Sequence, residues 1–141
     1  MKILFHSINN FSLKDRRKHR VWLIQLAQKE HKAIDTINYI FCDDQYLLRI
    51  NEKHLNHSTL TDIITFDYCT GDVLSGDIFI SIERVKENAK IYNVLFREEI
   101  KRIMAHGILH LCGYHDKKPN DKAIMTKKED YYLSLYFQNF R

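Results

Sequence analysis

Two histidines, a glycine and an aspartate in the last third of the chain have the spacing of a metal site. His106 and His110 are four residues apart, Gly113 follows after three residues, and Asp116 after three more. Residues four apart share one face of a helix, so the two imidazoles can hold the same ion. Gly113 suits the left-handed conformation that ends a helix, and the turn would bring Asp116 to that ion. Three ligands with a fourth position open are typical of catalytic zinc, and we expect one Zn²⁺ per chain.

The same spacing occurs in the zinc motif of metzincin proteases, His-Glu-x-x-His-x-x-Gly-x-x-His, with two differences. Asp116 stands where the third histidine would be, and a carboxylate oxygen is a suitable zinc ligand. His115, one residue earlier, is the alternative third ligand and would need a different turn. Gly107 replaces the glutamate that acts as the base in metalloproteases. A peptidase is therefore disfavoured, and the sequence identifies no catalytic base.

Length and composition indicate a globular protein, and we expect residues 1–141 to form a single domain. The chain is 45% hydrophobic and 28% charged, and it contains no apolar run long enough to span a membrane. Its first residues become polar too early for a signal peptide. The three cysteines include no Cys-x-x-Cys pair, so we expect free thiols in the cytoplasm.

Basic residues gather in two segments of the chain, from Lys14 to Arg20 and from Lys117 to Lys128. The formal net charge of +4 permits binding to nucleic acid without requiring it. Either segment alone is typical of a solvated helix face. We expect at least one of the two segments to lie at the rim of the metal-binding cleft, where it would contact phosphates.

Hydrophobic periodicity and turn residues predict alternating strands and helices. Strands are expected at residues 1–8, 33–42, 61–69 and 77–82, with residues 70–76 as a hairpin loop between the last two. Helices are expected at residues 17–30, 43–54, 83–91 and 121–137, and a further helix after Asn93 carries the two metal-binding histidines. This order predicts a mixed sheet packed with helices, of the α/β (α+β) class.

Details of these helices are also predicted. The first helix is expected to bury Val21, Leu23, Ile24 and Ala27. Asp43 or Asp44 is expected to cap the second helix, and Asn93 the metal-binding helix.

Gly107 falls within the apolar stripe of the metal-binding helix, which comprises Ile100, Ile103, Met104, Ile108 and Leu111. A glycine inside a helix costs roughly 1 kcal/mol relative to alanine. We therefore expect another backbone, that of a sheet, to approach the helix closely at Gly107. His106 and His110 lie beside this stripe, at the wall of a cleft.

Three blocks of the sequence resemble the YbeY family of bacterial endoribonucleases, which act as rRNA maturation factors. The blocks are Leu48–Asn51 leading to Thr61–Phe66, then Gly76–Ser81, and finally His106–Tyr114. The last block is specific, and the first two add order and spacing. The resemblance implies a mixed four-stranded sheet with about five helices, and a metal site on a central helix and the turn after it. It also implies zinc-dependent cleavage of single-stranded RNA, with roles in maturing the 3′ end of small-subunit rRNA and in ribosome quality control.

The chain departs from the family pattern at two positions. The family motif usually ends Gly-Tyr-Asp-His, with the last histidine as third ligand, whereas here His115 precedes Asp116. Counting from His110 places Asp116 at the ligand position. Leu55 stands where the family commonly has an arginine that faces the active cleft. His57, or a cation from the basic segments, would have to take the place of that arginine.

Two other functions stay open. A metal-dependent hydrolase of another substrate would need a replacement carboxylate near the ion. A non-catalytic ribosome assembly factor would hold a structural zinc with a full coordination shell. For RNA cleavage itself, either water or the 2′-OH of the RNA could attack the phosphate, and attack by the 2′-OH would need no carboxylate at position 107.

Overall fold

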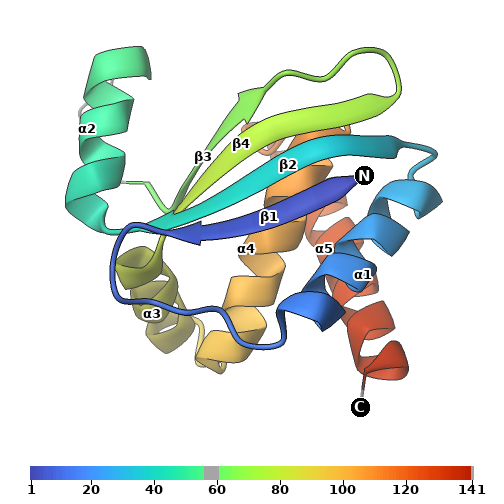
Figure 1. The fold of residues 1–141 in the computed structure, drawn as a ribbon. Coiled ribbons are helices and arrows are strands. Elements are labelled where there is room, and N and C mark those ends of the chain that lie inside the picture. The colour runs from blue at the N-terminus through green and yellow to red at the C-terminus, as the bar shows by residue number, and fades with distance from the viewer. Residues whose placement is uncertain (56–60, 141) are drawn as a thin grey trace.

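The computed structural model describes residues 1–55 and 61–140, except for the side chain of Leu55. Within these residues the elements follow in the order shown in Figure 1. They are β1 (Lys2–Ser7), α1 (Arg16–Lys29), β2 (Ala33–Cys42), α2 (Asp44–Leu55), β3 (Ile63–Asp67), β4 (Val73–Ser81), α3 (Ile82–Ile91), α4 (Phe96–Leu111) and α5 (Pro119–Asn139).

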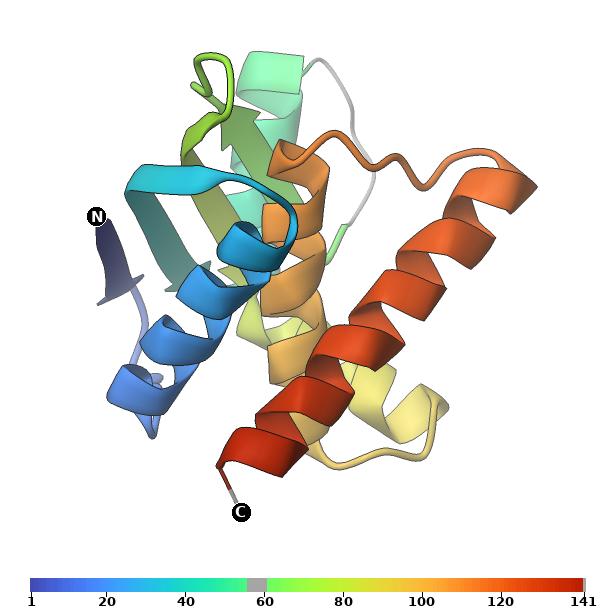
Figure 2. The same ribbon diagram turned by 90° about the vertical axis from the view of Figure 1, so that its right-hand side faces the viewer.

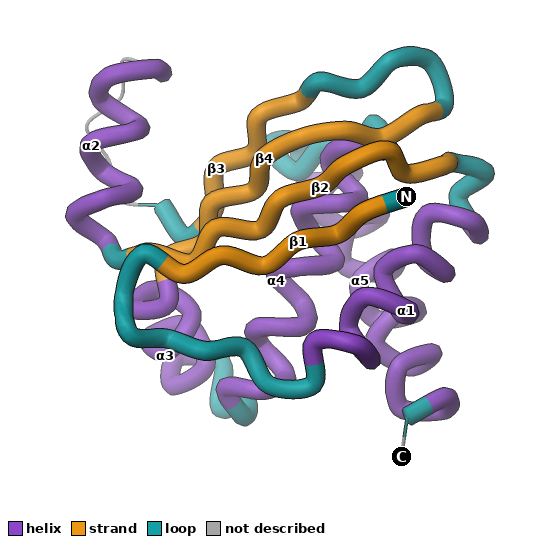
Figure 3. The backbone as a smooth tube through the Cα atoms, in the orientation of Figure 1, coloured by secondary structure: helices purple, strands orange, loops and turns teal. Residues whose placement is uncertain are grey.

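The strands form one sheet in the order β1-β2-β4-β3. Strand β2 pairs in parallel with both β1 and β4, whereas β3 pairs antiparallel with β4. The tube in Figure 3 shows the four strands side by side, with the helices around them. The predicted α/β (α+β) fold, a mixed four-stranded sheet packed with five helices, is confirmed.

The two faces of the sheet are covered differently. Helices α1, α3, α4 and α5 lie on one face, where alternate residues of β4 such as Ile78 and Ile80 are fully buried. Helix α2 lies away from α1, α4 and α5, is joined to α3 by the ion pair of Asp44 with Arg84, and buries Leu47 in a second, smaller cluster with Cys42 and Ile64. Figure 2 shows α1, α4 and α5 side by side, with α4 between the other two.

Helix α4 is the central helix, and its predicted apolar stripe from Ile100 to Leu111 is buried. A Cβ built on Gly107 would lie 3.0 Å from two methyl carbons of Ile78 and 3.3 Å from Cδ1 of Ile63. The sheet does approach Gly107 closely, as expected. The expectation of a neighbouring backbone is wrong, however, because the contacts come from side chains of β4 and β3.

Two further expectations about the helices are wrong. Val21 is 39% exposed, because the inward face of α1 is formed instead by Trp22, Leu23, Leu26 and Ala27. Asn93 does not begin α4, whose N-cap is Leu95.

Asn93 has φ 55° and follows the last turn of α3. This is the left-handed position that favours Gly or Asn at helix ends. At α2, by contrast, the predicted cap is confirmed, since the Asp43 carboxylate accepts a hydrogen bond from Tyr46 N at 2.8 Å.

Strand β4 begins at Val73, four residues earlier than expected. The connection from β3 is therefore shorter than the expected loop, which covered residues 70–76. The sequence did not predict this longer strand, because Gly76 lies within it and glycine is unfavourable inside a strand. A Cβ at Gly76 would lie only 2.4 Å from the carbonyl oxygen of Phe66 on the paired strand. The glycine therefore permits close pairing of β3 and β4.

In the described part of the chain, no helix combines the length and apolarity that crossing a membrane requires. Cys42, Cys69 and Cys112 are free.

Candidate metal centre

The turn after α4 is a Schellman motif, which reverses the chain beyond the second histidine. Gly113 has φ 107°, as expected for the residue after the helix cap. Its N–H donates to the carbonyl of His110 at 3.0 Å, and the N–H of Tyr114 donates to that of Leu109 at 3.1 Å. These two bonds satisfy carbonyls at the helix end and direct the following residues back along α4.

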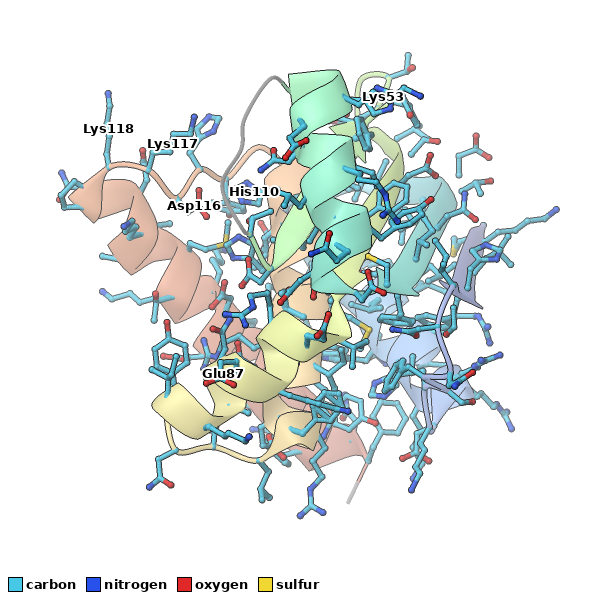
Figure 4. The ribbon with its side chains drawn as sticks, turned by 90° about the vertical axis from the view of Figure 1, so that its left-hand side faces the viewer. Lys53, Glu87, His110, Asp116, Lys117 and Lys118 are labelled. Carbon is cyan, nitrogen blue, oxygen red and sulfur yellow. The ribbon has the colours of Figure 1, made fainter. Side chains whose placement is uncertain are left out.

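The turn brings the three predicted metal-binding residues together. Oδ2 of Asp116 lies 3.1 Å from Nε2 of His106 and 3.4 Å from Nε2 of His110. One ligand atom from each residue lies within 4.8 Å of the others. Ligand atoms around a tetrahedral zinc would lie about 3.4 Å apart. The group therefore fits a metal ion in both chemistry and spacing, and Figure 4 shows Asp116 next to His110.

The alternative third ligand lies outside this group. His115 is exposed, and the group of donors found among the described residues consists of His106, His110 and Asp116. Spacing from Gly113 thus predicts the observed arrangement better than residue type does.

Each of the two histidines is held in place by a hydrogen bond at Nδ1, while its Nε2 lies near Asp116. Nδ1 of His106 lies 2.6 Å from Oε2 of Glu129, and Nδ1 of His110 lies 2.9 Å from the carbonyl oxygen of Tyr114. Both partners accept a hydrogen bond from Nδ1, which leaves each Nε2 available to bind a metal ion beside Asp116 when that nitrogen carries no proton. Bonds of this kind fix the tautomer and orientation of metal-binding histidines.

The electrostatic surroundings of the two imidazoles differ. Burial lowers the pKa of His106, but the hydrogen bond and negative charge of Glu129, together with Asp116, outweigh burial and raise it overall. Burial and the neighbouring His106 lower the pKa of His110. A metal ion at this group therefore competes with a proton mainly at His106.

Glu129 was missed in the sequence because it lies far from the histidines, on α5. Its carboxylate is buried and also accepts a hydrogen bond from Nη1 of Arg102 at 2.9 Å, while Nη2 of Arg102 contacts Asp130 at 2.6 Å. One signal could have revealed it: Glu129 occupies the inward stripe of α5, whose other members Met125, Tyr132, Leu133 and Tyr136 are apolar or aromatic. An acid within such a stripe needs a buried partner.

The loop that carries Asp116 is anchored to the end of α1. The hydroxyl of Tyr114 donates to Oε1 of Glu30 at 2.7 Å. Oε2 of Glu30 accepts from Nζ of Lys128 at 3.0 Å and from the hydroxyl of Tyr132. Because the carbonyl of Tyr114 also holds His110, this buried carboxylate links the metal-binding group to α1 and α5.

The metal-binding group lies in the wall of a cleft of about 1170 Å³. Lys117 and Lys122 line the cleft, so the expectation that a basic segment lies at its rim is confirmed for the segment from Lys117 to Lys128. The segment from Lys14 to Arg20 contributes none of the described lining residues. The expected substitutes for the family arginine cannot be compared in full, because the Leu55 side chain and His57 lie outside the described residues.

Two further carboxyl groups line the same cleft. Burial raises the pKa of Asp62, which accepts a hydrogen bond from Nδ2 of Asn88 at 3.2 Å. Burial also raises the pKa of Glu99 to about 7, against the opposing effect of Arg102. The lining of the cleft thus includes carboxyl groups that take up a proton more readily than exposed ones do.

Comparison of the sequence with known proteins assigns the chain to a family. The sequence profile of the family described as "Endoribonuclease YbeY" matches residues 5–136. The "Endoribonuclease YbeY" of Flavobacterium johnsoniae is 52% identical over 134 residues, covering 95% of this chain and 96% of the relative. That of Flavobacterium psychrophilum is 50% identical, with the same coverage.

The fold has a counterpart among solved structures. The solution structure of TM1509 from Thermotoga maritima superimposes with a TM-score of 0.70 at 24% identity, over 99% of this chain and 92% of that one. The sequence match spans nearly the whole chain, and it includes both histidines and the aspartate that converge at the end of α4. The chain belongs to the YbeY endoribonuclease family.

Proposed function

We propose that this chain is a zinc-dependent enzyme that cuts single-stranded RNA within the strand. Membership of the family makes it an endoribonuclease, a hydrolase that acts on RNA. The observation that carries the finer proposal is the convergence of His106, His110 and Asp116 in a cleft that Lys117 and Lys122 also line. Metal ligands and phosphate-binding cations are thus available to one bound strand.

His106, His110 and Asp116 would hold the metal in this proposal. Zinc, when bound, polarises a phosphoryl oxygen and lowers the pKa of water. Glu129 and the Tyr114 carbonyl keep the Nε2 atoms aimed at the ion, and Lys117 and Lys122 attract the phosphates. Arg102 also lines the cleft, but its guanidinium is paired with Glu129 and Asp130 and so supports the partner of His106.

A peptidase is not supported by the geometry at position 107. Gly107 packs against Ile78 and Ile63 of the sheet, so a side chain there would enter the core rather than the cleft. The base that metalloproteases carry next to their first histidine therefore has no room in this fold. Nor does a purely structural zinc account for three ligands in an open cleft, because structural sites have four protein ligands.

We further propose that residues 1–141 act as a single domain in the cytoplasm, on the 3′ end of small-subunit rRNA and in ribosome quality control. The support for these roles is the similarity to YbeY endoribonucleases over 95% of the chain. The three free cysteines agree with a reducing compartment.

Cleavage of an rRNA 3′-end fragment by the purified chain and by a His110→Ala variant tests this function. The wild-type chain should cut the single-stranded fragment and lose activity on treatment with a chelator, whereas the variant should be inactive. The same fragment with 2′-deoxy substitutions separates the two attacking groups: loss of cleavage indicates the 2′-OH, and retention indicates water.

Two outcomes would reject the proposal. Equal cleavage by the wild type and the His110→Ala variant would identify a contaminating nuclease. RNA binding without any cleavage by the metal-loaded wild type would instead favour the assembly factor with a structural zinc.

A further inference from the structure

The cleft extends along α4 beyond the metal-binding group. His106 and His110 lie 10 and 14 residues after Phe96, where α4 begins. The first residue of α4 that lines the cleft is Glu99, 7 and 11 residues before the two histidines, which corresponds to roughly 10 and 17 Å along the helix axis. A strand of about three to five nucleotides covers such a length at the spacing of stacked bases. Figure 4 shows Asp116 and Lys117 at one end of this arrangement and α3, which carries Glu87, at the other.

The two ends of the cleft differ in charge. Lys117 and Lys122 lie at the end that includes Asp116. Toward α3 the lining includes Asp62 and Glu99 instead. The lysines that line the cleft, Lys117 and Lys122, lie at the other end, so among the described residues no lysine lines this end to attract a phosphate. The end near α3 therefore suits a nucleobase better than it suits the phosphate backbone.

An exposed tyrosine lies at this second end. Tyr92 is the C-cap of α3, is 65% exposed, and lines the cleft together with Val94. In the described part of the chain its ring has no aromatic partner, and its hydroxyl has no hydrogen-bond partner. Every large apolar neighbour in this connection is exposed as well: Ile91, Val94 and Leu95 are 66%, 44% and 56% exposed. Solvation of so much apolar surface in one short connection is unfavourable unless a ligand covers part of it.

We propose that Tyr92 is a stacking platform for a base of the bound RNA, at the end of the cleft away from the lysines. The inference rests on the proposed single-stranded RNA substrate and adds a binding position to it. A base has a π-face whatever its identity, so such a platform accepts any sequence, and stacking contributes about 1–3 kcal/mol per base. In a duplex the bases are already stacked on one another and are unavailable, which accounts for a preference for single strands.

Binding of a fluorescein-labelled single-stranded RNA to the full chain tests this position, with all variants made on His110→Ala so that the strand stays intact. Tyr92→Ala should weaken binding about 5- to 150-fold, the equivalent of one stacked base. Tyr92→Phe, which keeps the ring, should bind within about twofold of the parent. Tyr68→Ala is the matched control, since Tyr68 is 58% exposed but is not part of the cleft lining.

The salt dependence of binding distinguishes stacking from charge. Tyr92→Ala should leave the slope of log K against log salt unchanged, because no phosphate contact is lost. Lys117→Gln combined with Lys122→Gln should flatten that slope. In a Tyr92→Trp variant, RNA should quench the new indole, which is distinguishable because the chain has one other tryptophan and that one is buried.

The possible failures are separable. If the His110→Ala parent binds no RNA, the proposed substrate and this platform fall together. If the parent binds RNA and Tyr92→Ala binds it equally well, the platform alone is rejected, and the exposed connection from Ile91 to Leu95 is assigned to a protein partner. If Tyr68→Ala weakens binding as much as Tyr92→Ala, the effect is not specific to the cleft and the proposal is rejected.

Discussion

Nδ1 of His106 lies 2.6 Å from the carboxylate of Glu129, a residue 23 positions later in the chain. The pair joins the central helix to the last one, and its bond aims Nε2 of His106 at Asp116. The candidate metal site is therefore built from two helices and a turn, although its three proposed ligands all lie within residues 106–116.

Replacing Glu129 tests this support directly. Glu129→Ala should weaken metal binding about 10- to 100-fold, because an orienting partner of a metal-binding histidine typically has an effect of that size. Asp130→Asn is a matched control, since Asp130 also contacts Arg102 but not His106. Competition with a chromogenic chelator measures both affinities, and equal affinities for the two variants would show that Glu129 does not support the site.

The identity of the third ligand is tested by two neighbouring substitutions. Asp116→Ala should reduce the metal content from about one ion per chain toward zero, because two histidines alone bind zinc weakly. His115→Ala should leave the metal content unchanged, since His115 is exposed and lies outside the donor group. Elemental analysis of the two purified variants measures this, and the reverse result would mean that the turn adopts the other register.

The anchor between Tyr114 and Glu30 allows a comparison of two tyrosines. Tyr114→Phe and Tyr132→Phe each remove one hydrogen bond to Glu30, and each should lower the free energy of unfolding by about 1 kcal/mol. Only Tyr114→Phe should also weaken metal binding, because Tyr114 lies in the loop that carries Asp116. Chemical denaturation and metal titration give the two quantities, and a loss of metal affinity in Tyr132→Phe alone would contradict the assignment.

His19 predicts a stability change in mild acid. It is buried against Tyr136, and its Nδ1 has no hydrogen-bond partner in the part of the chain that the structure describes. Burial, together with Lys101 from α4 and Lys18, lowers the pKa of His19 from 6.5 to about 4, although Asp15 opposes this. The folded state thus disfavours the charged form. The stability contributed by neutral His19 is complete above pH 6.5 and is lost as the pH falls toward 4, a loss of up to about 3 kcal/mol.

The measurement is urea unfolding of wild type and His19→Phe at neutral pH and near pH 4.5. The variant should lose less stability than wild type between these values, because Phe keeps the ring packing and does not titrate. His115→Gln, which removes an exposed histidine, should follow the wild type. Parallel losses in wild type and His19→Phe would show that His19 does not cause the acid sensitivity.

The sequence predicted those parts of the site that depend on local geometry. His106, His110, Gly113 and Asp116 lie on one helix and one turn, and the periodicity and turn chemistry of such segments can be derived from spacing alone. Glu129 could not be placed in the same way, because its partner depends on how α5 packs against α4. Tertiary packing also explains the error at Val21, because α1 buries the neighbouring face of the helix instead. It likewise explains the error at Asn93, which follows the end of one helix rather than capping the start of the next.

The position of Glu129 on the last helix affects a chain that ends before α5, whether because its synthesis is unfinished or because it has been truncated. It lies on α5, the last helix, whereas the three metal-binding residues all precede that helix. A chain that ends before α5 would contain every metal-binding residue yet lack the group that orients His106, together with Lys128 and Tyr132 that hold Glu30. If RNA cleavage needs the metal, as proposed above, full activity would be acquired only when the C-terminal helix has been made and has docked, and we expect a chain that ends before α5 to be a poor nuclease.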